Sequence, residues 1–142
     1  ERGEFLEHAR VFANCYGTYR AQVEASLGAG QDLILEIDWQ GARQIRRAMP
    51  ESVAIFVLPP SRAELERRLR GRGTDAEAVI QRRLRDAAAD MTHWGEFDFV
   101  VVNDDFDRAL EDLLGVVRGT ETERAVADRP GLAELAAELT RV

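Results

Sequence analysis

The apolar residues of the chain gather in three short runs, each of which ends in polar or turn-forming residues. The runs cover residues 33–39, 53–58 and 97–102. A nearly continuous apolar run of this length is typical of a strand that is buried on both faces, and such strands belong to parallel sheets covered by helices. The sequence therefore predicts three strands of one parallel sheet.

Apolar residues recur at helical spacing between and after these runs, and capping residues indicate where the helices begin. Thr18, Ser61, Thr74 and Asp105 can each act as an N-cap. Strands that alternate with helices in this way predict an α/β fold, a parallel sheet flanked by helices. For the helix after Asp105, Gly119 is the predicted end. The predicted buried residues of this helix are Ala109, Leu110, Leu113, Leu114 and Val117.

The composition is that of one ordinary globular domain, with 142 residues, 45% apolar and 32% charged. The net charge of −7 argues against general nucleic-acid binding, because phosphate backbones attract basic surfaces. No apolar run reaches the roughly 18 residues of a membrane span, and no signal peptide is visible. Cys15 is the single cysteine, which excludes a disulfide within the chain. We expect a cytoplasmic protein of unknown oligomeric state.

Two acidic residues follow the apolar core of the first predicted strand. Glu36 and Asp38 are two residues apart, so their side chains would point to the same side. They would lie at the carboxyl end of the strand, where open parallel sheets bind ligands. Carboxylates there could accept hydrogen bonds from a base or a hydroxyl, or hold the water shell of Mg²⁺. A strand that simply ends in solvated acids is an equally good interpretation of the spacing.

Arginines crowd the helical segments between residues 62 and 85, and all 19 basic residues of the chain are arginines. Arg72 lies between Gly71 and Gly73, and glycines let a segment act as a hinge. Guanidinium groups match phosphate oxygens, so a mobile arginine could close over a transferring phosphoryl group. Composition alone, however, favours a solvated helix face on which arginines pair with glutamates.

Four polar residues elsewhere in the chain could contact a nucleotide. The Glu7 carboxylate can accept from two donors of a guanine ring, and the hydroxyls of Tyr16 and Thr18 can donate to a phosphate. Asn103 follows the third predicted strand and could contact a base edge. Each also has an ordinary structural role, since Tyr16 could pack, Thr18 could cap a helix and Asn103 could belong to a turn.

Taken together and in order, these segments resemble the guanylate kinase family, whose members pass a phosphoryl group from ATP to GMP. The resemblance covers residues 2 to about 118. It implies a fold of the P-loop nucleoside monophosphate kinase type that is incomplete at its N-terminus, a role in purine nucleotide metabolism, and GMP and ATP as partners, with Mg²⁺ bound to ATP. The matching segments are Gly3-Glu4-Phe5-Leu6-Glu7, Asn14-Cys15-Tyr16-Gly17-Thr18, Ile34-Leu35-Glu36-Ile37-Asp38-Trp39-Gln40-Gly41, Pro59-Pro60-Ser61, Gly71-Arg72-Gly73-Thr74 and Val101-Val102-Asn103-Asp104-Asp105.

The resemblance implies a GMP-binding group of residues. Glu7 would accept hydrogen bonds from the guanine ring, and Tyr16 would hold the GMP phosphate. Thr18, Asp38 and Glu36 would complete the pocket.

It also implies residues that act on the phosphates and on ATP. Arg72 and Arg83 would be catalytic lid arginines, with Arg68 as a third candidate, and Arg72 would contact ATP as well. Asn103 would lie beside the adenine of ATP.

The resemblance divides the chain into a partial kinase domain, residues 1–118, and a C-terminal tail, residues 119–142, with a short amphipathic helix around Leu132, Leu135 and Leu139. Within the domain, the expected parts are a GMP-binding region at 1–30, a lid at 67–92 and a core at 31–66 and 93–118.

Two family features are missing from the printed residues: the Gly-rich phosphate loop with its lysine, and the two arginines that clamp the GMP phosphate. We therefore expect the 142-residue chain to be inactive alone. The alternative is a guanylate-kinase-like module that binds proteins without catalysis. The retained Glu7 and lid arginines favour the enzyme, because a binding module does not require them.

Overall fold

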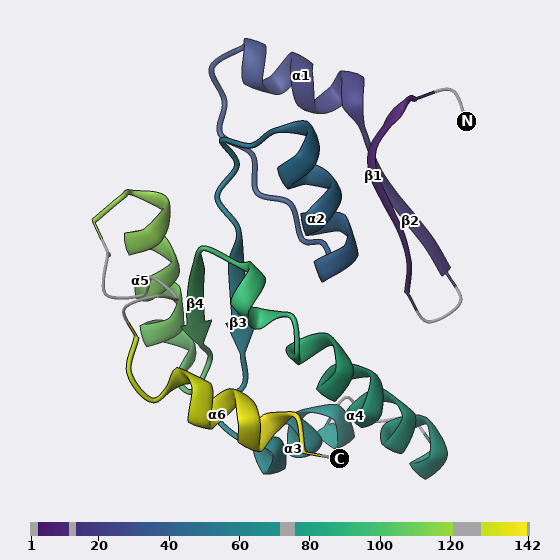
Figure 1. Ribbon diagram of the computed structural model, residues 1–142, viewed down its shortest axis with the longest axis vertical. Coiled ribbons are helices and arrows are strands. Elements are labelled where there is room, and N and C mark those ends of the chain that lie inside the picture. The colour runs from purple at the N-terminus through teal and green to yellow at the C-terminus, as the bar shows by residue number, and fades with distance from the viewer. Residues whose placement is uncertain (1–2, 12–13, 72–75, 121–128, 142) are drawn as a thin grey trace. The chain divides into compact units, whose positions relative to one another are not determined.

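The computed structural model describes residues 3–11, 14–71, 76–120 and 129–141 (Figure 1). The chain forms two compact units, Glu1–Val53 and Ala54–Val142. The elements in chain order are β1 (Phe5–Val11), β2 (Asn14–Tyr19), α1 (Arg20–Gly28), α2 (Trp39–Ala48), β3 (Ile55–Leu58), α3 (Arg62–Gly71), α4 (Glu77–Met91), the 3-10 helix η1 (Trp94–Glu96), β4 (Phe99–Val102), α5 (Phe106–Val117) and α6 (Leu132–Leu139).

The first unit is built on an antiparallel hairpin of β1 and β2, with α2 packed along β1 (Figure 1). Leu6, Val23 and Ile45, from β1, α1 and α2, form its buried core. The sequence did not predict this hairpin. Strands are recognised by alternating apolar and polar residues, and in β1 the charged Glu7 occupies a buried position next to Leu6.

The apolar run at 33–39 forms no strand, so that prediction was wrong. Residues 31–38 are irregular, and α2 already begins at Trp39. Leu35 and Ile37 pack against the core of the first unit, whereas Ile34 is 73% exposed. A strand requires a hydrogen-bonded neighbouring strand. Among the described residues no strand pairs with this segment. Without such a neighbour, the segment is not buried on both sides.

The second unit contains the parallel pair of β3 and β4, in which Ile55 lies opposite Phe99 and Leu58 opposite Val102. Helices α3 and α4 lie between the two strands in the chain. A parallel pair requires such a crossover connection, so the predicted α/β fold is confirmed. Both strands are shorter than the apolar runs that predicted them.

The predicted helix near the C-terminus is present as α6, and it belongs to the core of the second unit. Leu132 and Leu139 are buried together with Leu58, Met91 and Val100. α6 lies beside α4, as Figure 1 shows. Residues 132–139 thus stabilise the β3–β4 pair by covering it with apolar side chains.

Several predicted helix ends are confirmed. The Ser61 hydroxyl accepts from the Glu64 N–H at 3.2 Å, and Asp105 Oδ1 accepts from the Arg108 N–H at 3.0 Å. Gly119 ends α5 with a φ of 70°, which allows the Thr120 N–H to bond back to the Gly115 carbonyl at 2.9 Å. This left-handed conformation favours glycine because a Cβ atom would be strained there.

The remaining predicted caps are Thr18 and Thr74. Thr18 does not cap α1: Tyr19 occupies the N-cap position without a side-chain hydrogen bond, and the Thr18 hydroxyl bonds to Glu7 instead. Thr74 lies outside the described residues, and α4 begins at Glu77 with Ala76 at its N-cap position.

α5 buries a different side from the predicted one. Among the predicted residues Ala109 is buried, but Leu110, Leu114 and Val117 are exposed by 42%, 38% and 49%. Apolar residues at spacings of three and four allow two neighbouring stripes on one helix, and only the packing selects between them. The residues that α5 buries are Ala109, Asp112, Gly115 and Val116.

The packing of α6 leads to a stability prediction. Leu139 is fully buried, so Leu139→Ala should lower the free energy of unfolding by about 2–4 kcal/mol, through lost burial and the cavity left behind. Glu138→Ala, at an exposed neighbour in the same helix, should change it by less than about 0.5 kcal/mol. Denaturant unfolding measures both. Equal, small losses would show that α6 contributes little to the core.

Candidate functional site

The centre of the first unit is Glu7, which is charged yet only 3% exposed. The hairpin register places Thr18 opposite Glu7, and the Thr18 hydroxyl donates to Glu7 Oε1 at 2.7 Å. Glu7 Oε2 faces Gly41 of α2: a Cβ atom on Gly41 would lie 2.8 Å from it. A carboxylate has room for more donors than one hydroxyl, such as the ring and exocyclic N–H groups of a base.

α2 is held along β1 by the side chain of Gln44. Its Oε1 accepts from the His8 N–H at 3.1 Å, and its Nε2 donates to the His8 carbonyl at 2.7 Å. The amide thereby satisfies the backbone groups that a neighbouring strand would otherwise bond. Sequence reasoning missed Gln44, because no local pattern shows which backbone a glutamine will contact.

Asp38 has a structural role that the sequence did not predict. It is the N-cap of α2, where its Oδ1 accepts from the Gly41 N–H at 2.8 Å and its Oδ2 accepts from Gln40 Nε2 at 2.9 Å. Each oxygen keeps a second lone pair, so a ligand can still bond to Asp38. Glu36 is exposed in the irregular segment before it.

The structure therefore brings some of the predicted GMP-binding residues together. Glu7 and Thr18 are in contact, and Asp38 bonds to the backbone of Gly41, the residue that faces Glu7. Tyr16 lies two residues before Thr18 on β2, hence on the same face, and is 59% exposed. Among the described residues, no hydrogen bond or ion pair joins Glu36 to this group.

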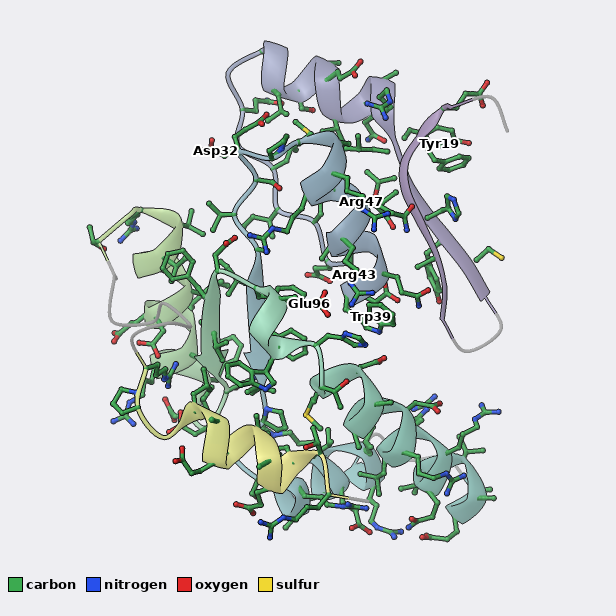
Figure 2. All side chains as sticks on the ribbon, viewed as in Figure 1. Tyr19, Asp32, Trp39, Arg43, Arg47 and Glu96 are labelled. Atoms are coloured by element: carbon green, nitrogen blue, oxygen red, sulfur yellow. The ribbon has the colours of Figure 1, made fainter. Side chains whose placement is uncertain are left out.

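An aromatic and a basic side chain also meet on the surface of α2. The Arg43 guanidinium lies over the Trp39 ring, 4.6 Å from its centroid (Figure 2). This cation–π contact joins residues one helical turn apart and stabilises the helix locally.

In the second unit, the arginines of α3 pair with glutamates, as the solvated-face interpretation predicted. Arg68 Nε donates to Glu64 Oε1 at 2.6 Å, and Arg67 bonds to both oxygens of Glu64. These two guanidinium groups hold the pKa of Glu64 at about 2, below its ordinary value of 4.5.

A second ion pair joins α3 to α4. Arg70 donates to both oxygens of Glu77 at 2.6 and 2.8 Å and also bonds to Glu66. Arg70, followed by the Gln81 amide, holds the pKa of Glu77 at about 2. The Glu77 carboxylate thus joins the first turn of α4 to the last turn of α3.

The remaining predicted residues lie in different surroundings. Arg83 is half-buried in α4 and has contacts of its own. Arg72 lies outside the described residues. Asn103 directly follows β4, and its backbone N–H continues the strand pairing by donating to the Leu58 carbonyl at 2.8 Å.

The length of the helices bears on membrane spanning, and the clustering of acidic, histidine and cysteine side chains bears on metal binding. In residues 3–11, 14–71, 76–120 and 129–141, no helix is long and apolar enough to cross a membrane. Within the same ranges, no three or more His, Cys, Asp or Glu side chains come together as metal ligands. Glu36 and Asp38 belong to no such cluster.

The parallel strands with crossover helices define an α/β protein. A family model described as guanylate kinase matches residues 1–120. The chain belongs to the guanylate kinase family.

Individual relatives agree with this assignment. The guanylate kinase of Chromohalobacter salexigens is 55% identical over 142 residues, which are 100% of this chain and 66% of that protein. The guanylate kinase of Escherichia coli K12 is 56% identical over 117 residues, which are 82% of this chain and 56% of that protein. The crystal structure of the Anaplasma phagocytophilum guanylate kinase matches with a TM-score of 0.68 at 34% identity, covering 99% of this chain and 68% of that one.

The ion pairs of α3 and α4 predict how stability depends on pH. Because folding lowers the pKa of Glu77 from 4.5 to about 2, its pair should stabilise the fold above pH 4.5 and lose this effect as the pH falls toward 2. Glu77→Gln should lower the melting temperature slightly near neutral pH, and its difference from wild type should vanish near pH 2. Melting curves from pH 7 to 2 measure this, with Glu111→Gln, at an exposed residue of α5, as the control. A difference between wild type and Glu77→Gln that is independent of pH would contradict the role of the Arg70 pair.

Proposed function

We propose that the complete protein is a guanylate kinase, which transfers the γ-phosphoryl group of ATP to GMP and gives ADP and GDP. The observation that carries this proposal is the buried Glu7 carboxylate. Guanine presents two adjacent donors, N1–H and the exocyclic amine, whereas adenine presents an acceptor at N1. A buried carboxylate therefore favours guanine, since adenine offers one donor, its exocyclic amine, and faces the carboxylate with an acceptor at N1.

The relatives from Chromohalobacter salexigens and Escherichia coli support the proposal, because both are named guanylate kinase. The chain spans 66% of the Chromohalobacter protein and 56% of the Escherichia coli protein. For this reason the kinase activity is proposed for a protein of the relatives' full length, and the kinetic and binding experiments below use that protein.

In the GMP pocket, the proposed roles follow the contacts of the first unit. Glu7 accepts from the guanine ring while Thr18 holds one of its oxygens. The exposed Tyr16 hydroxyl donates to the GMP phosphate, and Asp38 and Glu36 border the pocket.

The arginines are proposed to stabilise the negative charge on the transferring phosphoryl group. Arg72 and Arg83 are the leading candidates, and Arg72 also contacts ATP. Arg68 is the weakest, because Glu64 already holds it at 2.6 Å. Asn103 is placed beside the adenine of ATP, and Mg²⁺ is proposed to bind ATP through its phosphates.

The reaction is proposed to take place in the cytoplasm. Cys15 is a free, exposed thiol, and a reducing compartment keeps such a thiol from oxidising.

The role of Glu7 is tested by Glu7→Gln in the complete protein. Replacing the carboxylate removes charge-assisted hydrogen bonds worth roughly 1.5–3 kcal/mol, so GMP affinity should fall about 10- to 100-fold. ATP affinity should change much less. Calorimetric titration with each nucleotide measures both, with Glu4→Gln, at an exposed residue just before β1, as the control. Equal losses for GMP and ATP would count against Glu7 as the guanine acceptor, and a wild-type protein without GMP-dependent ADP production would count against the kinase.

The catalytic role of Arg83 is tested by Arg83→Ala in steady-state kinetics. An arginine that contacts the phosphates mainly in the transition state affects kcat more than binding, and its loss should lower kcat on the order of 10²-fold or more. The KM for GMP should change much less. The matched control is Arg82→Ala, which removes the exposed neighbour in the same helix. An unchanged kcat for Arg83→Ala would remove Arg83 from the catalytic residues.

A further inference from the structure

The contacts between α2 and β1 point to two residues that act on the nucleotide through Glu7. We infer that Gly41 and Gln44 are positioning residues, which set where the Glu7 carboxylate stands and so how well the pocket selects guanine. This inference rests on the proposed function, because it assumes that Glu7 contacts the base. It requires no contact of Gly41 or Gln44 with GMP.

Gly41 acts through the space that its missing side chain leaves. A Cβ atom at this position would lie 2.8 Å from Glu7 Oε2 and 3.4 Å from Glu7 Cδ. The first distance is too short for a stable contact, so an alanine would displace the carboxylate. Glu7 ends in a flexible side chain that can move more easily than a backbone, although a Cβ would also lie 3.1 Å from Ile37 Cβ. The expected result is a folded protein whose guanine acceptor is misplaced.

The Gly41 backbone is itself fixed by the start of α2. Its N–H donates to Asp38 Oδ1 at 2.8 Å, which holds the first turn in place. Asp38 therefore supports Glu7 indirectly, because it fixes the backbone atom that borders Glu7 Oε2.

Gln44 fixes the strand beneath the carboxylate. It lies three residues after Gly41, on the same side of α2. Its amide bonds to both backbone groups of His8, the residue next to Glu7, and also donates to the Gln40 carbonyl of its own helix at 3.2 Å. Gln44 thus sets the position of β1 against α2, while Gly41 provides the space in which Glu7 fits.

Gly41→Ala in the complete protein is the first test. The Kd and KM for GMP should rise about tenfold or more, as expected for a displaced charged acceptor. The kcat and the KM for ATP should change much less, and the melting temperature should stay close to wild type. Gly28→Ala is the matched control: it makes the same chemical change in the same unit, at a position where a Cβ would meet nothing within 4 Å, and it should leave GMP binding unchanged.

Gln44→Glu tests the second residue and provides an independent result if Gly41→Ala lowers the melting temperature strongly. A carboxylate can still accept from the His8 N–H but cannot donate to the His8 carbonyl. GMP affinity should therefore fall several-fold, whereas Gln31→Glu, at an exposed residue of the same unit, should have no effect.

A double-mutant cycle separates positioning from a general structural effect. If Gly41 and Gln44 act through Glu7, then Gly41→Ala and Gln44→Glu should have little further effect on GMP affinity when Glu7→Gln is already present. Additive losses would overturn the inference, and so would wild-type GMP affinity in both single variants. A wild-type protein that does not bind GMP would instead overturn the proposed function, and the inference with it. A wild type that binds GMP, combined with unaffected variants, would overturn the inference alone.

Discussion

The burial of the Glu7 carboxylate is the constraint on which the first unit depends. A charged group removed from water costs free energy unless nearby donors satisfy it. β2 supplies the Thr18 hydroxyl, and α2 supplies a position without a side chain, Gly41, where the second oxygen fits. Gln44 then holds α2 to the strand that carries Glu7. The hairpin and the helix are thus arranged around one buried acceptor.

The second unit combines a well-packed core with a weakly held arginine surface. Leu58, Val100 and Leu139 are buried among apolar neighbours, which favours a rigid β3–β4–α6 core. The guanidinium group of Arg70, in contrast, forms an exposed ion pair with Glu77, and such pairs contribute little stability.

Local sequence features predicted the parts of the structure that depend on neighbours along the chain. The capping roles of Ser61 and Asp105, the end of α5 at Gly119 and two of the three predicted parallel strands are confirmed, because hydrogen bonds within a few residues and apolar runs determine them. Motifs along the chain also identified the guanylate kinase family and selected Glu7 and Thr18, which the structure brings into contact.

The sequence by itself therefore determined the fold class, the N-caps at Ser61 and Asp105, and the family. Only the tertiary structure decided which side of α5 is buried and that residues 31–38 form no strand. It also decided that Gln44 bonds to His8, 36 residues away in the chain. These features depend on contacts between distant segments, and a spacing pattern shows which residues share a face but not what that face will meet.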